Sequence, residues 1–113
     1  MRVELPWINP VLSPNARTHW AKAAKAKKKA RQDAATICRG YRGEKPSTGP
    51  VRVHLTFCAP TNRRRDLDNA IASMKAALDG VSDYLGIDDN EFILTARWGD
   101  VRKGGAVVVE VSQ

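Results

Sequence analysis

The feature that most constrains the fold is an alternating segment in the middle of the chain. Between residues 51 and 59 every second residue is apolar, namely Val51, Val53, Leu55, Phe57 and Ala59. A period of two places successive side chains on opposite faces of a β-strand, so this strand has one buried face and one polar face. Pro60 follows and ends the strand. The fold must therefore contain a sheet that is covered on one side.

Two segments with helical spacing lie on either side of this strand. The first runs from about His19 to Arg39, with Thr18 as a candidate cap and an inner face of small side chains: Ala23, Ala26, Ala30, Ala34 and Ile37. Such small residues allow close approach to a neighbouring helix. The second segment has an apolar stripe from Leu67 to Leu85. We expect one continuous helix there despite Gly80, with Gly86 as its C-terminal cap.

Shorter β-segments complete the pattern. Val3 and Leu5 predict a first strand, and residues 91–101 and 107–111 predict two more, joined as a hairpin at Gly104-Gly105. The order is β-α-β-α-β-β, which predicts an α+β (α/β-like) fold with a mixed sheet packed against two helices. A length of 113 residues indicates one domain, 1–113.

The charge is strongly and unevenly basic. The chain has 19 Lys and Arg against 12 Asp and Glu, a net charge of +7. Residues 17–31 contain seven basic residues and no acidic one. This excess favours polyanionic partners.

The remaining composition argues against several other classes of protein. Cys38 and Cys58 fit no metal-ligand spacing, and we expect buried, reduced thiols. No apolar run approaches the roughly 20 residues of a membrane span, and the first residues lack the apolar stretch of a signal peptide. We therefore expect a soluble, cytoplasmic protein without a membrane partner.

The most chemically suggestive motif joins three arginines to two carboxylates. It reads Arg63-Arg64-Arg65-Asp66-Leu67-Asp68-Asn69 and precedes the second helix. Aspartate is common at helix caps and in first turns, which is the structural interpretation of both carboxylates. Carboxylates that hold Mg²⁺ beside arginines that hold phosphate are also what a phosphodiester-cutting site requires.

Two further charged positions extend this motif. On one continuous helix Lys75 shares a stripe with Asp68, with Ala72 between them. The pair Asp88-Asp89 follows the helix end, but a helix from Asp68 to Leu85 is roughly 26 Å long. Asp89 therefore reaches Asp68 only if the helix is shorter, if the chain runs back along it, or if a partner subunit supplies it.

Together these motifs resemble the RusA family, the phage and prophage-type Holliday junction resolvases. The resemblance is carried by the arginine-aspartate run, by Lys-Ala-Ala-Leu-Asp-Gly at 75–80 and by Gly86-Ile87-Asp88-Asp89. Leu5-Pro6-Trp7, the stretch from Asn15 to Trp20 and Lys103-Gly104-Gly105 are similar too. The resemblance spans nearly the whole chain, and its acidic part is the specific one.

The resemblance implies a Mg²⁺-dependent, structure-specific endonuclease that acts as a homodimer on four-way DNA junctions in recombination and repair. Asp66, Asp68 and Asp89 match the family's metal-binding carboxylates, and Lys75 matches its essential lysine, although it comes three residues later than in the best-known member. We expect DNA contacts from the arginine run, Asn69 and the first helix: Arg63, Arg64, Arg65, Asn69, Lys22, Lys25, Lys27, Lys28 and Lys29.

Two alternatives remain open at this point. The chain could be a non-catalytic basic module that binds DNA or RNA through its lysine-rich helix, with the aspartates acting as caps. It could also be a Mg²⁺-dependent nuclease that uses the same residues on flaps or replication forks. Whether Asp88 shares the metal is left open as well.

Overall fold

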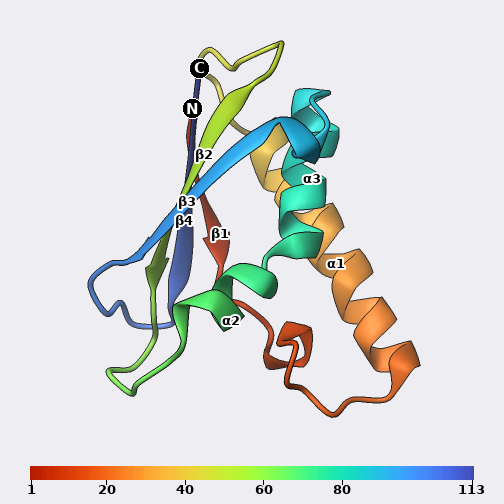
Figure 1. The fold of residues 1–113 in the computed structure, drawn as a ribbon, viewed down its shortest axis with the longest axis vertical. Coiled ribbons are helices and arrows are strands. Elements are labelled where there is room, and N and C mark those ends of the chain that lie inside the picture. The colour runs from red at the N-terminus through yellow and green to blue at the C-terminus, as the bar shows by residue number, and fades with distance from the viewer.

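The structure, a computed structural model, describes residues 1–113 as one four-stranded sheet with the helices packed against one face (Figure 1). The strands are β1 (Arg2–Pro6), β2 (Val51–Cys58), β3 (Phe92–Trp98) and β4 (Ala106–Ser112), and the helices are α1 (Trp20–Arg39), α2 (Leu67–Ala72) and α3 (Lys75–Leu85). Two short 3-10 helices, η1 (Pro10–Leu12) and η2 (Asp89–Glu91), lie in the connections. The predicted α+β fold with a mixed sheet is confirmed.

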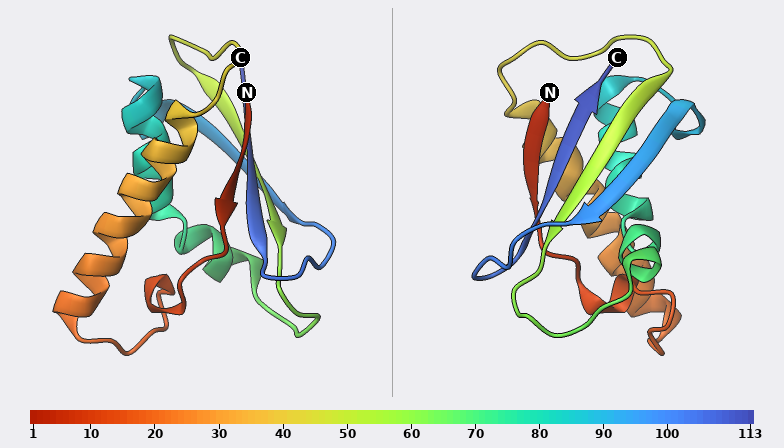
Figure 2. Two further views of the ribbon diagram at one scale, coloured as in Figure 1. Left: turned by 180° about the vertical axis from the view of Figure 1, so that it is seen from behind. Right: turned by 60° about the vertical axis from the view of Figure 1, so that its left-hand side comes forward.

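The sheet has the order β1-β4-β2-β3. β4 pairs antiparallel with both β1 and β2, whereas β2 pairs parallel with β3, as the view from the side shows (Figure 2). The predicted hairpin between the last two strands is therefore wrong, because β2 lies between them. Burial gives the reason: Val107 and Val109 of β4 are fully buried, while Ile93 and Leu94 of β3 are exposed. The most apolar strands occupy the centre, and β3 forms an edge.

The alternation in β2 is confirmed. Val51, Val53, Leu55 and Phe57 are fully buried, and Arg52 between them is exposed. The Phe57 ring also contacts two tryptophans, with ring centroids 6.4 Å from Trp7 and 5.7 Å from Trp98. The inner face of β2 is thus the middle of the hydrophobic core.

The small residues of α1 bring it against α3, as predicted. A Cβ on Gly80 would lie 2.2 Å from the carbonyl oxygen of Arg31 and 3.0 Å from Cβ of Ala34, so only glycine fits this crossing. Gly80 is therefore a packing residue and not a helix break. The Arg31 guanidinium adds a paired contact to Asp83 of α3, through Nε at 2.7 Å and Nη2 at 2.8 Å.

The start of α1 differs by one residue from the prediction. The cap is His19, whose Nδ1 accepts a hydrogen bond from the Ala21 amide at 3.2 Å, and not Thr18. His19 has a non-helical backbone (φ −54°, ψ 137°), so α1 begins at Trp20. None of the helices, α1 included, is long and apolar enough to cross a membrane.

The predicted second helix is divided, so the expectation of one continuous helix is wrong. α2 ends at Ala72, and α3 begins at Lys75. At the break the Ser73 hydroxyl donates to the Asn69 carbonyl at 2.7 Å, a back-bond that bends helices. Met74 turns into the core and is 3% exposed. Gly86 ends α3 in the left-handed conformation (φ 69°), as predicted.

Cys38 and Cys58 are both buried and unpaired, as expected. Burial raises the pKa of the Cys38 thiol. The Cys38 thiol is therefore not poised for chemistry at neutral pH.

Candidate functional site

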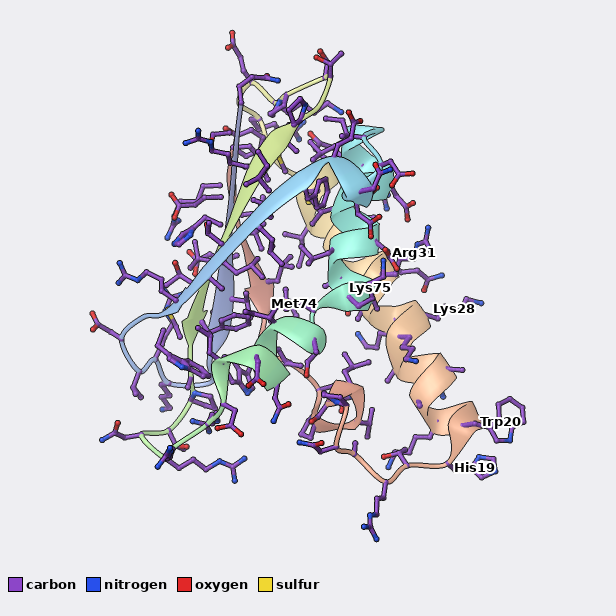
Figure 3. All side chains as sticks on the ribbon, viewed as in Figure 1. His19, Trp20, Lys28, Arg31, Met74 and Lys75 are labelled. Carbon is purple, nitrogen blue, oxygen red and sulfur yellow. The ribbon has the colours of Figure 1, made fainter.

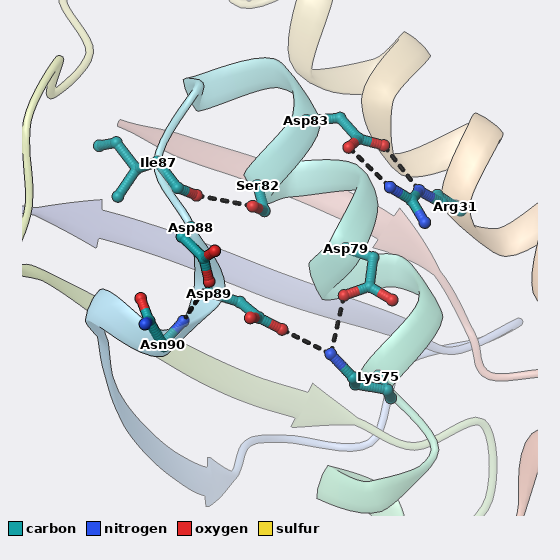
Figure 4. Close-up of polar contacts among 9 residues, drawn as sticks. All are labelled: Arg31, Lys75, Asp79, Ser82, Asp83, Ile87, Asp88, Asp89 and Asn90. Carbon is teal, nitrogen blue, oxygen red and sulfur yellow. Dashed lines mark hydrogen bonds and ion pairs between the residues drawn. The ribbon is translucent and has the colours of Figure 1, made fainter.

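Lys75 is the centre of a charged cluster on α3. Its ammonium lies 2.9 Å from Oδ1 of Asp79, one turn along the helix, and 2.5 Å from Oδ2 of Asp89 (Figure 4). The chain reaches Asp89 by turning at Gly86 and running back beside α3. The chain thus runs back along the helix, as one of the alternatives required, but the return brings Asp89 to Lys75 and not to Asp68.

The return of the chain is fixed by two local hydrogen bonds. The Ser82 hydroxyl donates to the Ile87 carbonyl at 2.6 Å, just past the glycine turn. Asp88 caps η2, because its Oδ1 accepts from the Asn90 amide at 2.9 Å (Figure 4). Asp88 thus has a structural partner of its own.

The charges in this cluster stabilise one another. The hydrogen bond from Lys75 is the main cause that lowers the pKa of the Asp89 carboxyl. In turn, Asp89 and Asp79 raise the pKa of Lys75. Lys75 is therefore held as an ammonium ion between two carboxylates, and it is not available as a base.

Asp66 and Asp68 lie at the other end of the divided helix. Asp66 occupies the N-cap position of α2, but its side chain makes no capping hydrogen bond, and its one contact is Asn69 Nδ2 at 3.5 Å. Asp68 is exposed in the first turn and forms no hydrogen bond or ion pair. Both carboxylates are thus free to meet a cation from solution.

The arginines that precede them line an open hollow of about 600 Å³. Its wall also includes Trp7, Trp98 and Ser73, and it contains these predicted site residues: Arg63, Arg64, Arg65, Asp66 and Asn69. The structure therefore brings most of the arginine-aspartate motif together on one concave surface.

The three arginines differ in their roles. The Arg65 guanidinium donates to the carbonyl and to Oγ1 of Thr61, each at 2.8 Å, and lies 5.7 Å from the centre of the Trp7 ring. Arg65 thus fastens the loop that carries the motif. Arg63 and Arg64 are exposed and donate no side-chain hydrogen bond, so they are the arginines available to an external anion.

The predicted metal-binding trio does not come together within one chain. No group of three or more histidine, cysteine, aspartate or glutamate side chains is placed to hold a metal ion. The break at Ser73 and Met74 also interrupts the stripe that was expected to join Asp68 to Lys75. Asp89 faces an ammonium ion in place of its predicted carboxylate partners.

The lysines of α1 form a second basic surface. Lys29 is paired with Asp33 at 2.5 Å, whereas the other four predicted DNA-contacting lysines of this helix have no acidic partner: Lys22, Lys25, Lys27 and Lys28. Lys27 and Lys28 line a hollow of about 430 Å³ together with Lys75. Lys75 therefore faces the basic helix.

Comparison with known proteins gives one informative relative. A protein of Xylella fastidiosa (strain Temecula1 / ATCC 700964), described as an uncharacterized protein, is 40% identical over 112 residues, which cover 96% of this chain and 73% of the relative. The chain belongs to the family of this protein. No protein-family model matches the chain. Membership of this family therefore assigns no activity to the chain.

Two features of the site were not predicted from the sequence. Asp79 holds Lys75, and its position four residues after the lysine is a helical pairing that the sequence does display. Trp7 and Trp98, which help to form the arginine-lined hollow, come from segments 91 residues apart, and no local pattern joins them.

Proposed function

We propose that the chain is a Mg²⁺-dependent, structure-specific endonuclease that cuts phosphodiester bonds in branched DNA, four-way junctions above all. The proposal combines the resemblance to the RusA family with the arrangement of charges on the surface. Its place of action would be the cytoplasm, where bacterial DNA recombines.

The observation that carries the proposal is the hollow in which Asp66 lies beside three arginines. Arginine offers paired donors to phosphate oxygens, and an exposed carboxylate attracts a metal ion. A DNA backbone seated there would have its phosphate against Arg63 and Arg64, beside the carboxylate of Asp66. Asp68, two residues further on, is exposed but does not line the hollow.

The donor set fits Mg²⁺ only in part. Three carboxylates do not converge in the single chain, so no complete protein site exists there. Mg²⁺ commonly binds to one or two carboxylates and completes its shell with water and substrate phosphate, and exposed Asp66 and Asp68 suit that mode. When bound, the ion would supply a more acidic water molecule and offset negative charge on the phosphate.

The chain's own cations would perform the remaining tasks. Arg63 and Arg64 would orient the backbone, and Lys27 and Lys28 would hold phosphates further along it. These contacts depend on charge and read no sequence. Lys75 already pairs with Asp79 and Asp89, so it would contribute less to phosphate binding than Lys27 and Lys28 do.

A homodimer belongs to the proposal. A four-way junction has two strands to be cut at related positions, and a dimer with twofold symmetry presents two matching sites. A second copy could also supply Asp89 to the Asp66 and Asp68 of the first, which is the remaining way to assemble the three carboxylates.

A non-catalytic nucleic-acid-binding module is the second candidate, and the Lys75–Asp89 ion pair favours it. A carboxylate neutralised by an ammonium ion at 2.5 Å is a poor metal ligand. On that account the same basic surfaces bind DNA or RNA without cleavage.

Cleavage of labelled DNA separates the two candidates. A four-way junction and a linear duplex are incubated with the protein in Mg²⁺ or in chelator. The proposal expects Mg²⁺-dependent cutting of the junction, lost in Asp66→Asn and Asp68→Asn while binding persists. Glu44→Gln, an exposed carboxyl in the α1–β2 loop at the opposite end of the sheet from α2 (Figure 1), is the matched control. Binding without any metal-dependent cutting supports the second candidate.

A further inference from the structure

The most exposed large apolar side chain is that of Trp20, the first residue of α1. It is 76% exposed. Figure 3 shows its indole and the His19 imidazole at the end of α1, projecting away from the sheet. An exposed tryptophan is costly in water, and neither folding nor the proposed cleavage site uses this one.

The position of the indole is supported by its neighbour. The His19 ring lies 5.6 Å from the Trp20 ring, centre to centre, with 32° between the planes. The capping hydrogen bond to the Ala21 amide holds the imidazole in place. A ring that is braced in this way loses little conformational entropy when a flat ligand stacks on it.

The half of α1 that begins at Trp20 carries basic and no acidic side chains. Lys27 follows Trp20 by seven residues, which returns it to within about 20° of the same helix face, and Lys28 lies about 12 Å along the axis. Ala24, one turn after Trp20, has a small side chain, so no bulky group stands between Trp20 and the two lysines. Lys27 and Lys28 have no acidic partner and line a hollow together with Arg31 and the Lys75–Asp79 pair. Figure 3 shows Trp20, Lys28 and Lys75 on the same flank of the molecule.

We propose that Trp20 is a stacking platform for an unpaired nucleobase, and that Lys27 and Lys28 hold the backbone of the same single strand. Aromatic rings beside a basic track are the usual means of binding single-stranded nucleic acid. Each base has a flat face, so the contact requires no particular sequence. At a branched substrate the ligand would be a base displaced from pairing.

A membrane surface is the competing ligand, since it also attracts tryptophan beside lysines. A helix that lies in a lipid surface needs a broad apolar face. In this half of α1 Trp20 is the one exposed large apolar residue, and the alanines Ala23, Ala26 and Ala30 face the body of the molecule and are half-buried. The charge and the single ring therefore favour a nucleic acid.

Binding in chelator tests the inference apart from cleavage. The probes are a labelled 16-nucleotide oligothymidine, an abasic strand of equal length and phosphatidylserine vesicles. Stacking contributes about 1–3 kcal/mol per base, so Trp20→Ala should weaken oligothymidine binding roughly 5- to 150-fold. Trp20→Phe should recover most of it. Because Trp20 is exposed, these variants should fold normally, and Val101→Ala, at a residue 52% exposed, is the control.

The abasic strand supplies the decisive comparison. If Trp20 stacks on bases, Trp20→Ala leaves binding of the abasic strand unchanged. An equal loss on both strands, or no loss on oligothymidine, overturns the inference. So does a loss confined to binding of phosphatidylserine vesicles, which would assign the ring to lipid.

The inference takes its class of ligand, nucleic acid, from the proposed function, but the two fail in different ways. Equal affinity of the wild type and Trp20→Ala for oligothymidine contradicts only the stacking platform. Binding without cleavage contradicts only the nuclease.

Discussion

Lys75 and Asp89 are fourteen residues apart in the sequence, yet the ammonium nitrogen and the carboxylate oxygen Oδ2 lie 2.5 Å apart. This ion pair joins the start of α3 to the turn after its end. It also occupies a carboxylate that the proposed metal site needs. Asp89 can therefore bind a metal ion only when its ion pair with Lys75 is broken.

Removal of the lysine should release Asp89. In Lys75→Met the hydrogen bond that depresses the Asp89 pKa is lost, so this pKa should rise toward the ordinary aspartate value of about 3.9. Carboxyl NMR titration of the wild type and the variant measures the change. Lys29→Met breaks a different exposed ion pair, Lys29–Asp33, and should leave the pKa of Asp89 unchanged. An unchanged pKa in Lys75→Met would mean that the ion pair is absent in solution.

The same pair gives a pH dependence of stability with a defined sign. Because the folded pKa of Asp89 is lowered, its contribution is present above the unfolded aspartate value and is lost as pH falls through the folded value. Because the folded pKa of Lys75 is raised, its contribution is present below about pH 10 and is lost only in stronger alkali. Urea unfolding of the wild type and of Lys75→Met should therefore differ at pH 7 and converge as the pH falls below the unfolded aspartate value of about 3.9 and through the lower folded value of Asp89. A constant difference across that range would contradict this linkage.

The crossing of α1 and α3 should not tolerate a methyl group at Gly80. An added Cβ meets the Arg31 carbonyl at 2.2 Å, and overpacking of this kind typically costs about 1–3 kcal/mol. Urea unfolding of Gly80→Ala should show that loss. Gly40→Ala is the matched control, since Gly40 has a right-handed backbone (φ −78°) and its Cβ would contact the Ile37 carbonyl at 3.3 Å. A Gly80→Ala protein as stable as Gly40→Ala would mean that the helices are further apart.

The lysines of α1 should contribute unequally to DNA binding. Each phosphate neutralised on duplex DNA adds roughly 0.9 to the slope of log affinity against log salt. Lys28→Gln should lower the slope by about that amount. Lys29→Gln should lower it less, because Asp33 already pairs with Lys29 at 2.5 Å. Equal slopes for the wild type and Lys28→Gln would mean that Lys28 contacts no DNA phosphate.

The sequence predicted the fold class and most of the helices and strands, but it did not predict the order of the strands in the sheet. The alternation in β2 and the small residues of α1 are local signals, and each reports directly which side chains are buried. The neighbours of β4 depend on competition among all the strands for the centre of the sheet. A glycine pair that forms a turn between β3 and β4 contains no information on that competition.

The candidate site was predicted in part for a similar reason. Arg63, Arg64, Arg65 and Asp66 are consecutive, so they were bound to share a surface. The position of Asp89 depends on the break at Ser73 and Met74 and on the turn at Gly86. The break follows from one hydroxyl back-bond and one buried methionine, which helical periodicity does not reveal.

The most direct test of the proposed nuclease is cleavage of a labelled four-way junction by the purified protein with Mg²⁺, with chelator, and in the Asp66→Asn variant. The account predicts paired cuts that require Mg²⁺, that exceed cutting of linear duplex, and that disappear in Asp66→Asn while junction binding remains. Junction binding by the wild type with no Mg²⁺-dependent cut in either strand would contradict it.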